Sequence, residues 1–203
     1  MRNLLLLPMA VFSFAAVSNA KKPETIEHKL KWARETIDAF AVTHHFEAPA
    51  RISGSKWQVT RIEGCQVELK ESAHRESPDS AVTGEGIFGL SEDRIVMWSF
   101  NLANLIPRFI AASDVGGPHI EIVSEGDAFH FNTEGESRTV RKDGTTVNTT
   151  NWSAPGTAQN FRMYFDSPDA DNNLLVRRLE HDLRDAVDRC GVEARSADHH
   201  RWK

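Results

Sequence analysis

The chain has few of the residues and motifs that mark common enzyme chemistry. Its 203 residues include two cysteines and one tyrosine, and neither cysteine has another cysteine or a histidine nearby at the spacing of a structural zinc site. A Gly-x-Ser-x-Gly frame around a serine nucleophile is absent, and so is a His-Glu-x-x-His zinc motif. The sequence therefore predicts no catalytic residue, no metal site and no cofactor.

The first twenty residues have the order of a secretory signal peptide. A basic head, Met1-Arg2-Asn3, precedes an apolar run from Leu4 to Val17, and Ser18-Asn19-Ala20 places small side chains at the cleavage site. We expect cleavage after Ala20. A lipid anchor would need a cysteine at the next position, which Lys21 occupies. The sequence thus predicts an exported protein, periplasmic or extracellular, with no transmembrane anchor after signal cleavage.

Charge excludes a further class of partner. The formal net charge of the chain is −5, and cleavage would also remove the positive charge of Arg2. An acidic protein is not generally attracted to DNA, RNA or anionic lipid surfaces. We therefore expect no nucleic-acid partner.

The two cysteines, Cys65 and Cys190, form an even pair. In an oxidising compartment such a pair is expected to be bridged, which predicts a Cys65–Cys190 disulfide. Two buried thiols are the alternative.

Residues 21–54 are expected to form an N-terminal helix followed by a linker. Between Pro23 and Thr43 the apolar residues recur every three or four positions, as they do on one face of an amphipathic helix. The stretch 44–54 contains Pro49 and Gly54 and shows no clear period, which is typical of a linker. The apolar face consists of Ile26, Leu30, Ala33, Ile37, Phe40 and Ala41.

Residues 55–192 are expected to form a single α+β domain. Alternating patterns predict strands at 57–61 and 65–69, with a turn or a bulge at Gly64, and 95–100 predicts a buried strand. The polar stretch 72–86 predicts a loop, and Pro107 interrupts an apolar segment from Leu102 to Ile110. Further strands are predicted at 119–123, 128–133, 137–142, 145–150 and 160–165, with turns at Glu134-Gly135 and Asp143-Gly144 and a loop through Pro155-Gly156.

A C-terminal amphipathic helix completes the predicted domain. Ser167 is expected to cap it, with Pro168 at its first position and Gly191 at its end. Residues 193–203 are expected to form a flexible tail. The predicted fold is α+β: an N-terminal amphipathic helix, a mainly antiparallel β-sheet or partly open barrel, and the C-terminal helix packed on it.

The polar candidates for a site have ordinary interpretations. His44-His45 and Asp198-His199-His200 lack the ligand spacings of metal sites. The glycine pairs at 84–86 and 116–117 are interpreted as turns. A carboxylate pair for acid–base chemistry could come from Glu121, Asp127, Glu134 or Glu136, although acids on an outward strand face are usually solvated.

Some apolar and aromatic residues could face a partner. Trp152 is expected in a loop, and the segment that contains Leu102, Leu105 and Phe109 is either a recognition surface or cover for the core. Asn148-Thr149-Thr150 and Asn151-Trp152-Ser153 match the N-glycosylation pattern, which would be used only in a eukaryotic secretory pathway.

The layout resembles the pleckstrin-homology-like arrangement, a β-sheet body closed by one C-terminal helix, and is similar to uncharacterised exported bacterial proteins. The phrases that carry the resemblance are Cys65-x-Val67-x-Leu69, Phe100-x-Leu102-x-x-Leu105 and the pattern from Leu179 to Gly191. The resemblance implies a binding scaffold. Its phospholipid pocket would need a basic cluster, whereas here Lys70, His74 and Arg75 alternate with Glu68, Glu71 and Glu76.

The sequence as a whole favours a non-catalytic binding or envelope-associated module. Its expected partner is a protein, a glycan or an apolar ligand. An envelope hydrolase with an unrecognised site and a carrier of an apolar ligand are the alternatives. A hydrolase needs convergent polar groups in a cleft, and a carrier needs an apolar cavity of about 300 Å³ or more.

Overall fold

The computed structural model describes residues 25–42, 51–83, 86–141, 143–167 and 170–201. The predicted signal peptide, the histidines at 44–45 and the predicted helix position of Pro168 lie outside these residues. Among the described residues, no helix is both long and apolar enough to span a membrane.

The N-terminal segment forms two short helices in place of the single predicted helix. Helix α1 spans Ile26–Lys29 and α2 spans Lys31–Phe40, with Leu30 between them outside the helical region at φ −82° and ψ 0°. The Thr25 side chain accepts a hydrogen bond from the His28 N–H and so caps α1. The predicted apolar face is correct, since Ile26, Leu30, Ala33 and Ile37 are buried.

Five long antiparallel strands form the larger sheet, in the order β2-β3-β4-β7-β8. The turns predicted at Gly64 and Asp143-Gly144 are confirmed, and both glycines have positive φ, 54° and 84°. The strands are β2 (Arg51–Glu63), β3 (Gln66–Thr83), β4 (Gly86–Asn101), β7 (Phe129–Arg141) and β8 (Thr146–Ala158).

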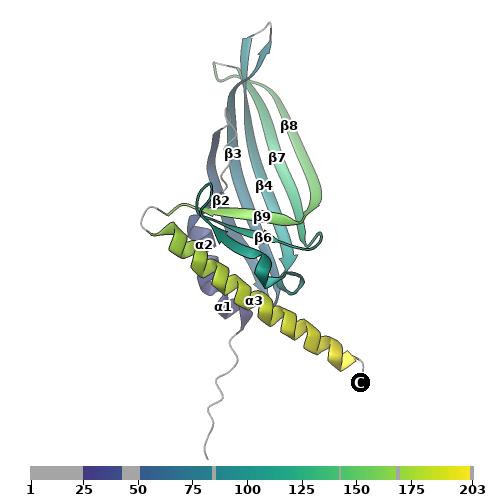
Figure 1. Ribbon diagram of the computed structural model, residues 1–203. Helices are drawn as coiled ribbons and strands as arrows, with labels where there is room; N and C mark the ends of the chain where they lie inside the picture. Colours follow the sequence, from purple (N-terminus) through teal and green to yellow (C-terminus); the bar gives the residue numbers. More distant parts are fainter. Residues whose placement is uncertain (1–24, 43–50, 84–85, 142, 168–169, 202–203) are drawn as a thin grey trace, which may run out of the picture.

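Three predicted irregular segments of this sheet are in fact strand. The loop predicted at 72–86 is occupied up to Thr83 by β3, the turn predicted at Glu134-Gly135 lies inside β7, and Pro155-Gly156 lies inside β8. The three strands predicted at 128–133, 137–142 and 145–150 therefore belong to one long β7–β8 hairpin. The strands extend well beyond the helices and the smaller sheet, as Figure 1 shows. In this extended part the strands do not need an apolar face for packing, so their residues can be polar.

The smaller sheet has the order β1-β9-β6-β5 and is also antiparallel. It comprises β1 (Ala41–Val42), β5 (Ile110–Ser113), β6 (His119–Val123) and β9 (Asn160–Phe165). The strands predicted at 119–123 and 160–165 are thus confirmed. Two 3-10 turns, η1 (Leu102–Asn104) and η2 (Pro107–Phe109), form the apolar segment between β4 and β5. The two sheets do not close into a barrel.

The C-terminal helix α3 spans Asn172–Arg201 and crosses the lower part of the molecule in Figure 1. Its start and end differ from the prediction. The Asp171 carboxylate accepts from the backbone N–H groups of Asn173 and Leu174, so Asp171 rather than Ser167 caps it. Gly191 lies inside the helix, which continues into the predicted tail.

The core lies between the lower half of the larger sheet, the smaller sheet and the helices. Trp57 and Phe161 stack at 6.0 Å, and Phe129 meets Phe161 edge to face at 4.9 Å. Cys65 and Cys190 form the predicted disulfide, which joins the β2–β3 turn to α3. The Arg184 guanidinium adds two hydrogen bonds to the Ile110 carbonyl, and α3 is thereby fastened to both sheets.

Candidate binding surface

One face of the larger sheet is not covered by any described element. Side chains on adjacent strands share a face when they are opposite in register, and all the buried residues of these five strands lie on the other face. That buried set is Trp57, Val59, Val67, Leu69, Glu71, Ala73, Ser77, Val96, Phe100 and Phe129. The uncovered face is therefore available to a partner.

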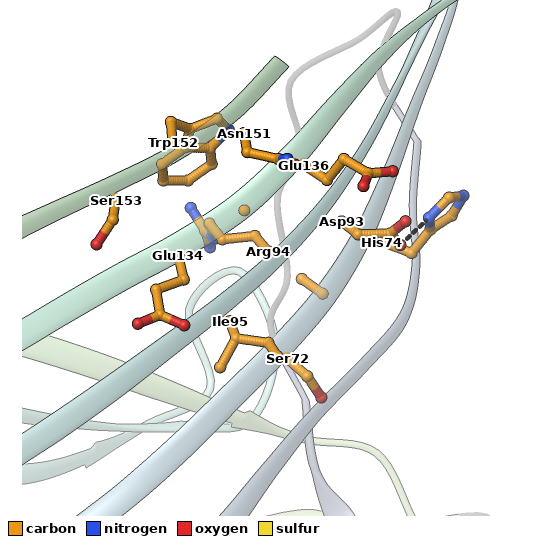
Figure 2. Close-up of a pocket in the computed structure, with 12 residues that line it drawn as sticks. Ser72, His74, Asp93, Arg94, Ile95, Glu134, Glu136, Asn151, Trp152 and Ser153 are labelled. Atoms are coloured by element: carbon orange, nitrogen blue, oxygen red, sulfur yellow. Dashed lines mark hydrogen bonds and ion pairs between the residues drawn. The ribbon is translucent and has the colours of Figure 1, made fainter. Parts of the chain in front are cut away.

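A broad, shallow hollow of about 790 Å³ runs across β3, β4, β7 and β8 (Figure 2). Its lining follows the register of the strands. Two cross-strand rows belong to the uncovered face, and the row between them points its side chains to the opposite face. The rows are Ser72–Ile95–Glu134–Ser153 and His74–Asp93–Glu136–Asn151, and the row between is Ala73–Arg94–Gly135–Trp152.

His74 lies at one end of the hollow between two carboxylates. Its Nδ1 is 2.7 Å from Asp93 and its Nε2 is 3.2 Å from Glu76, and Figure 2 shows the His74 ring and the Asp93 carboxylate turned toward each other. The hydrogen bond to Asp93, followed by that to Glu76, raises the pKa of His74 above its ordinary value. These contacts favour the protonated imidazolium.

The remaining carboxylates differ in how far they are neutralised. Arg138 pairs with Glu136 and lies 3.7 Å from Asp93. Glu134 has no basic partner among the described residues, and its carboxylate accepts a hydrogen bond from the uncharged Asn132 amide at 3.1 Å. The negative charge of the hollow is therefore concentrated at Glu134.

Apolar side chains lie beside this carboxylate. Ile95 is directly opposite Glu134 in register, and Met97 is the next outward residue along β4. Both are unusually open for large apolar residues, with exposed fractions of 39% and 38%. The middle of the uncovered face thus combines an apolar strip with an uncompensated acid.

The opposite face beneath the hollow holds a buried polar contact. The Glu71 carboxylate, which is 5% exposed, accepts from Arg94 at 2.9 Å and from the indole N–H of Trp98 at 3.3 Å. Because a buried carboxylate without such donors would be strongly unfavourable, these contacts hold β3 and β4 in register below the hollow.

The serine hydroxyls and the imidazole that line the hollow do not contact each other. The two hydroxyls of its lining are directed elsewhere: Ser72 donates to the Lys56 carbonyl, and Ser153 contacts the Asn132 amide oxygen at 3.5 Å. His74 therefore has no hydroxyl nucleophile within hydrogen-bond distance among the described residues. The described residues also contain no group of three or more side chains that could bind a metal ion together.

The residues predicted as a partner surface are mostly inside. Leu102 and Leu105 are 1% and 5% exposed and pack in the core, so core cover is their role. Phe109 is half-buried beneath the Arg108 guanidinium at 4.8 Å. Trp152 is half-buried, and its indole N–H donates to Ser137 at 3.3 Å. Of the four, only Trp152 lines the hollow.

Of the predicted acid–base candidates, Glu134 and Glu136 both line the hollow, two residues apart on the uncovered face of β7, whereas the other two lie elsewhere. Glu121 is bound by Arg162 on the smaller sheet, and Asp127 is exposed in the loop before β7. Both potential glycosylation sites, Asn148 and Asn151, lie exposed on β8. Sequence reasoning missed Ser72, Ile95 and Asn151 as neighbours because it treated their segments as separate loops and strands.

The glycines at 84, 86 and 89 have the Gly-x-Gly-x-x-Gly spacing. A phosphate-binding loop of this type connects a strand to a helix, whose N-terminus receives the phosphate. Here Gly86 and Gly89 belong to strand β4, which follows β3 in a hairpin. The spacing is therefore coincidental.

An apolar cavity between α2 and the two sheets measures about 20 Å³. That is about the space of one water molecule, far below what a ligand carrier needs. A second surface hollow, of about 450 Å³, lies between α2 and α3 where the Arg178 guanidinium stacks on Trp32 at 3.9 Å. Its polar lining does not suit an apolar ligand.

Comparison of the chain with protein-family models, curated proteins and solved structures found no match.

Proposed function

We propose that the protein is an exported, non-catalytic binding module that holds a basic segment of a partner protein against the uncovered face of its larger sheet. The signal-peptide pattern and the disulfide support export. The observation that carries the binding proposal is the hollow in which the Glu134 carboxylate lies beside Ile95.

The side chain that best fits this arrangement is lysine or arginine. Both have an apolar stem and a cationic head, and they bury the stem on apolar surface while the head stays hydrated or paired. The strip formed by Ile95 and Met97 offers a place for the stem, and Glu134 offers the counter-charge for the head. Asn151 lines the same hollow, and its amide can hydrogen-bond the backbone of an extended segment, while the Ser72 and Ser153 hydroxyl oxygens remain available as acceptors.

A glycan fits less well because sugar rings stack on exposed aromatic faces. The aromatic residue of the lining is Trp152, and its ring lies over Gly135 on the opposite face of the sheet. An apolar ligand also fits less well, because the apolar surface at the hollow consists of the Ile95–Met97 strip, which charged groups surround.

The test is binding of a fluorescent oligolysine peptide, compared with an oligoglutamate peptide of equal length, followed by anisotropy. We expect the basic peptide to bind and added salt to weaken it. Glu134→Gln should reduce affinity about fivefold, the contribution of a favourable surface ion pair. Glu125→Gln is the matched control, since that exposed carboxylate lies outside the hollow and faces Arg108.

Backbone amide shifts in NMR spectra should change around Ile95, Glu134 and Ser153 when the basic peptide is added. The proposal fails if the two peptides bind equally weakly, if Glu134→Gln behaves like Glu125→Gln, or if an oligosaccharide rather than the basic peptide shifts these amides.

A further inference from the structure

Of the four sheet edges in the described residues, three are short, interrupted or partly occupied by side chains of the same chain. An open strand edge presents unpaired N–H and C=O groups, and proteins shorten, bend, charge or cover such edges. Strand β1 has two residues, and β5 has four, with its Ile110 carbonyl taken by Arg184. Strand β2 is interrupted by two register shifts, and its Val59 N–H donates to Asp38 of α2 at 2.6 Å.

Strand β8 is the exception. It is the outer strand of the larger sheet, its thirteen residues pair with β7 on one side, and no other strand pairs with it in the described part of the chain. It contains no charged residue between Thr146 and Ala158, whereas β2 carries Lys56, Arg61 and Glu63. None of the usual protections except Pro155 is present on this edge.

Pro155 also indicates which backbone groups face outward. Proline has no N–H and in a sheet takes positions whose N–H direction points away from the neighbouring strand. Pro155 is opposite Asn132 in the β7–β8 ladder. Because the direction alternates with a period of two, the N–H and C=O groups of Ser153, Asn151 and Thr149 point to the open edge as well.

We propose that β8 pairs antiparallel with β8 of a second copy of this chain, joining the two larger sheets into one continuous sheet across a twofold axis. A contact between two identical antiparallel strands is self-complementary when the twofold axis passes between the two copies of one residue, so that this residue lies opposite its own counterpart. With the axis at Asn151, Thr149 of each copy lies opposite Ser153 of the other, so all the outward groups of these residues are paired. Pro155 then ends the pairing.

The absence of charge on β8 favours a second copy as the occupant. A strand with charged residues near its centre would place like charges opposite each other in a symmetric pair, which is unfavourable. Here hydroxyl and amide side chains meet, and such cross-strand pairs are favourable. On the other face, Trp152 lies opposite the second copy's Thr150, so its half-exposed ring gains cover.

Cysteine crosslinking tests the register directly. Residues in a hydrogen-bonded antiparallel pair have Cα atoms about 5.5 Å apart, which is within the range of a disulfide. In Asn151→Cys the new thiols face each other, and they should form a covalent dimer on mild oxidation. Thr157→Cys is the matched control on the same strand, because it lies beyond Pro155, where the pairing ends, and far from its own counterpart. The native cysteines are already bridged.

Sedimentation of the oxidised protein gives the second readout. We expect a concentration-dependent dimer, and Asn151→Pro, which removes an outward N–H from each copy without touching the β7 ladder, should raise the dissociation constant about tenfold or more. Glu134→Gln should leave it unchanged, because Glu134 lies on β7 and outside the β8 contact. A dimer that persists in Glu134→Gln while basic-peptide binding falls distinguishes the two proposals, since Asn151 belongs to both surfaces.

Three results would overturn the proposal. The first is a protein that stays monomeric up to its solubility limit. The second is equal crosslinking of Asn151→Cys and Thr157→Cys. The third is a folded Asn151→Pro variant, verified by circular dichroism, that dimerises like the unchanged protein. Should Asn151→Pro fail to fold, the crosslinking result alone decides.

Discussion

Replacing Cys65 and Cys190 by alanine should strongly lower the free energy of unfolding. The disulfide connects residues 125 positions apart. In the chain-entropy model, a crosslink over a loop of this length stabilises the folded state by about 5 kcal/mol, and measured values are commonly about 2 to 4 kcal/mol. Since a domain has a total stability of about 5 to 15 kcal/mol, we expect a large fall in the denaturation midpoint.

The assay is urea unfolding followed by circular dichroism, for the oxidised protein, each single alanine variant and the double variant. Either single replacement removes the whole crosslink, so each should lose nearly as much as the double variant, and the effects should not add. Fully reduced protein should unfold like the double variant. A double variant that loses less than about 1 kcal/mol, or single effects that add, would refute the loop-entropy reasoning.

Three further predictions concern the larger sheet. Arg94→Met should cost about 2 to 4 kcal/mol because it removes the guanidinium that pairs with the buried Glu71 carboxylate, and Glu71→Leu in the same chain should restore most of it in a double-mutant cycle; an unchanged midpoint for Arg94→Met would contradict this. Gly135→Ala should cost about 1 to 3 kcal/mol, since a Cβ there overlaps the Trp152 ring, and near-ultraviolet dichroism should report the displaced indole. The pKa of His74 is raised from its ordinary 6.5 by Asp93 and Glu76, so the stability advantage over His74→Gln should be full below that pH and disappear as the pH rises through the folded-state pKa; unfolding midpoints measured against pH check it, and a gap that widens at high pH would count against it.

The elements that pack on the core were predictable because their patterns record burial. The alternation of Trp57 and Val59, and of Val67 and Leu69, follows the covered face of β2 and β3. In α3 the apolar face through Leu179 and Leu183 was predicted for the same reason. The disulfide followed from the cysteine count together with the export signal.

The uncovered half of the larger sheet left no such record. Residues 72–83 of β3 contain no apolar alternation and therefore resemble a loop in sequence. Ile95 and Met97 were predicted to be buried within an apolar run, whereas they lie on the uncovered face. The hollow therefore depends on how β3, β4, β7 and β8 pair with one another. The sequence pattern did not identify these strands as neighbours.

The end of α3 was missed for an energetic reason. A glycine inside a helix costs only about 1 kcal/mol relative to alanine. Gly191 follows Cys190, and the disulfide of Cys190 holds this turn of α3 against the core. After Gly191 the chain continues with Glu193-Ala194-Arg195, residues that favour helix. A glycine reliably ends a helix only where leaving the helical conformation is favourable for the chain. At Gly191 it is not favourable, and the helix continues.

The long β7–β8 hairpin could have been predicted by extending the turn at Asp143-Gly144. That turn already paired Arg138 with Thr149. Continuing the same register places Gly135 opposite Trp152 and Gly156 opposite Phe131, and in both pairs the aromatic ring covers the glycine of the other strand. A glycine opposite an aromatic residue is a recognised device for pinning register in a sheet. The sequence pattern predicts a turn at Gly135 and a loop at Gly156. In the structure, each glycine instead leaves room for an aromatic ring of the neighbouring strand.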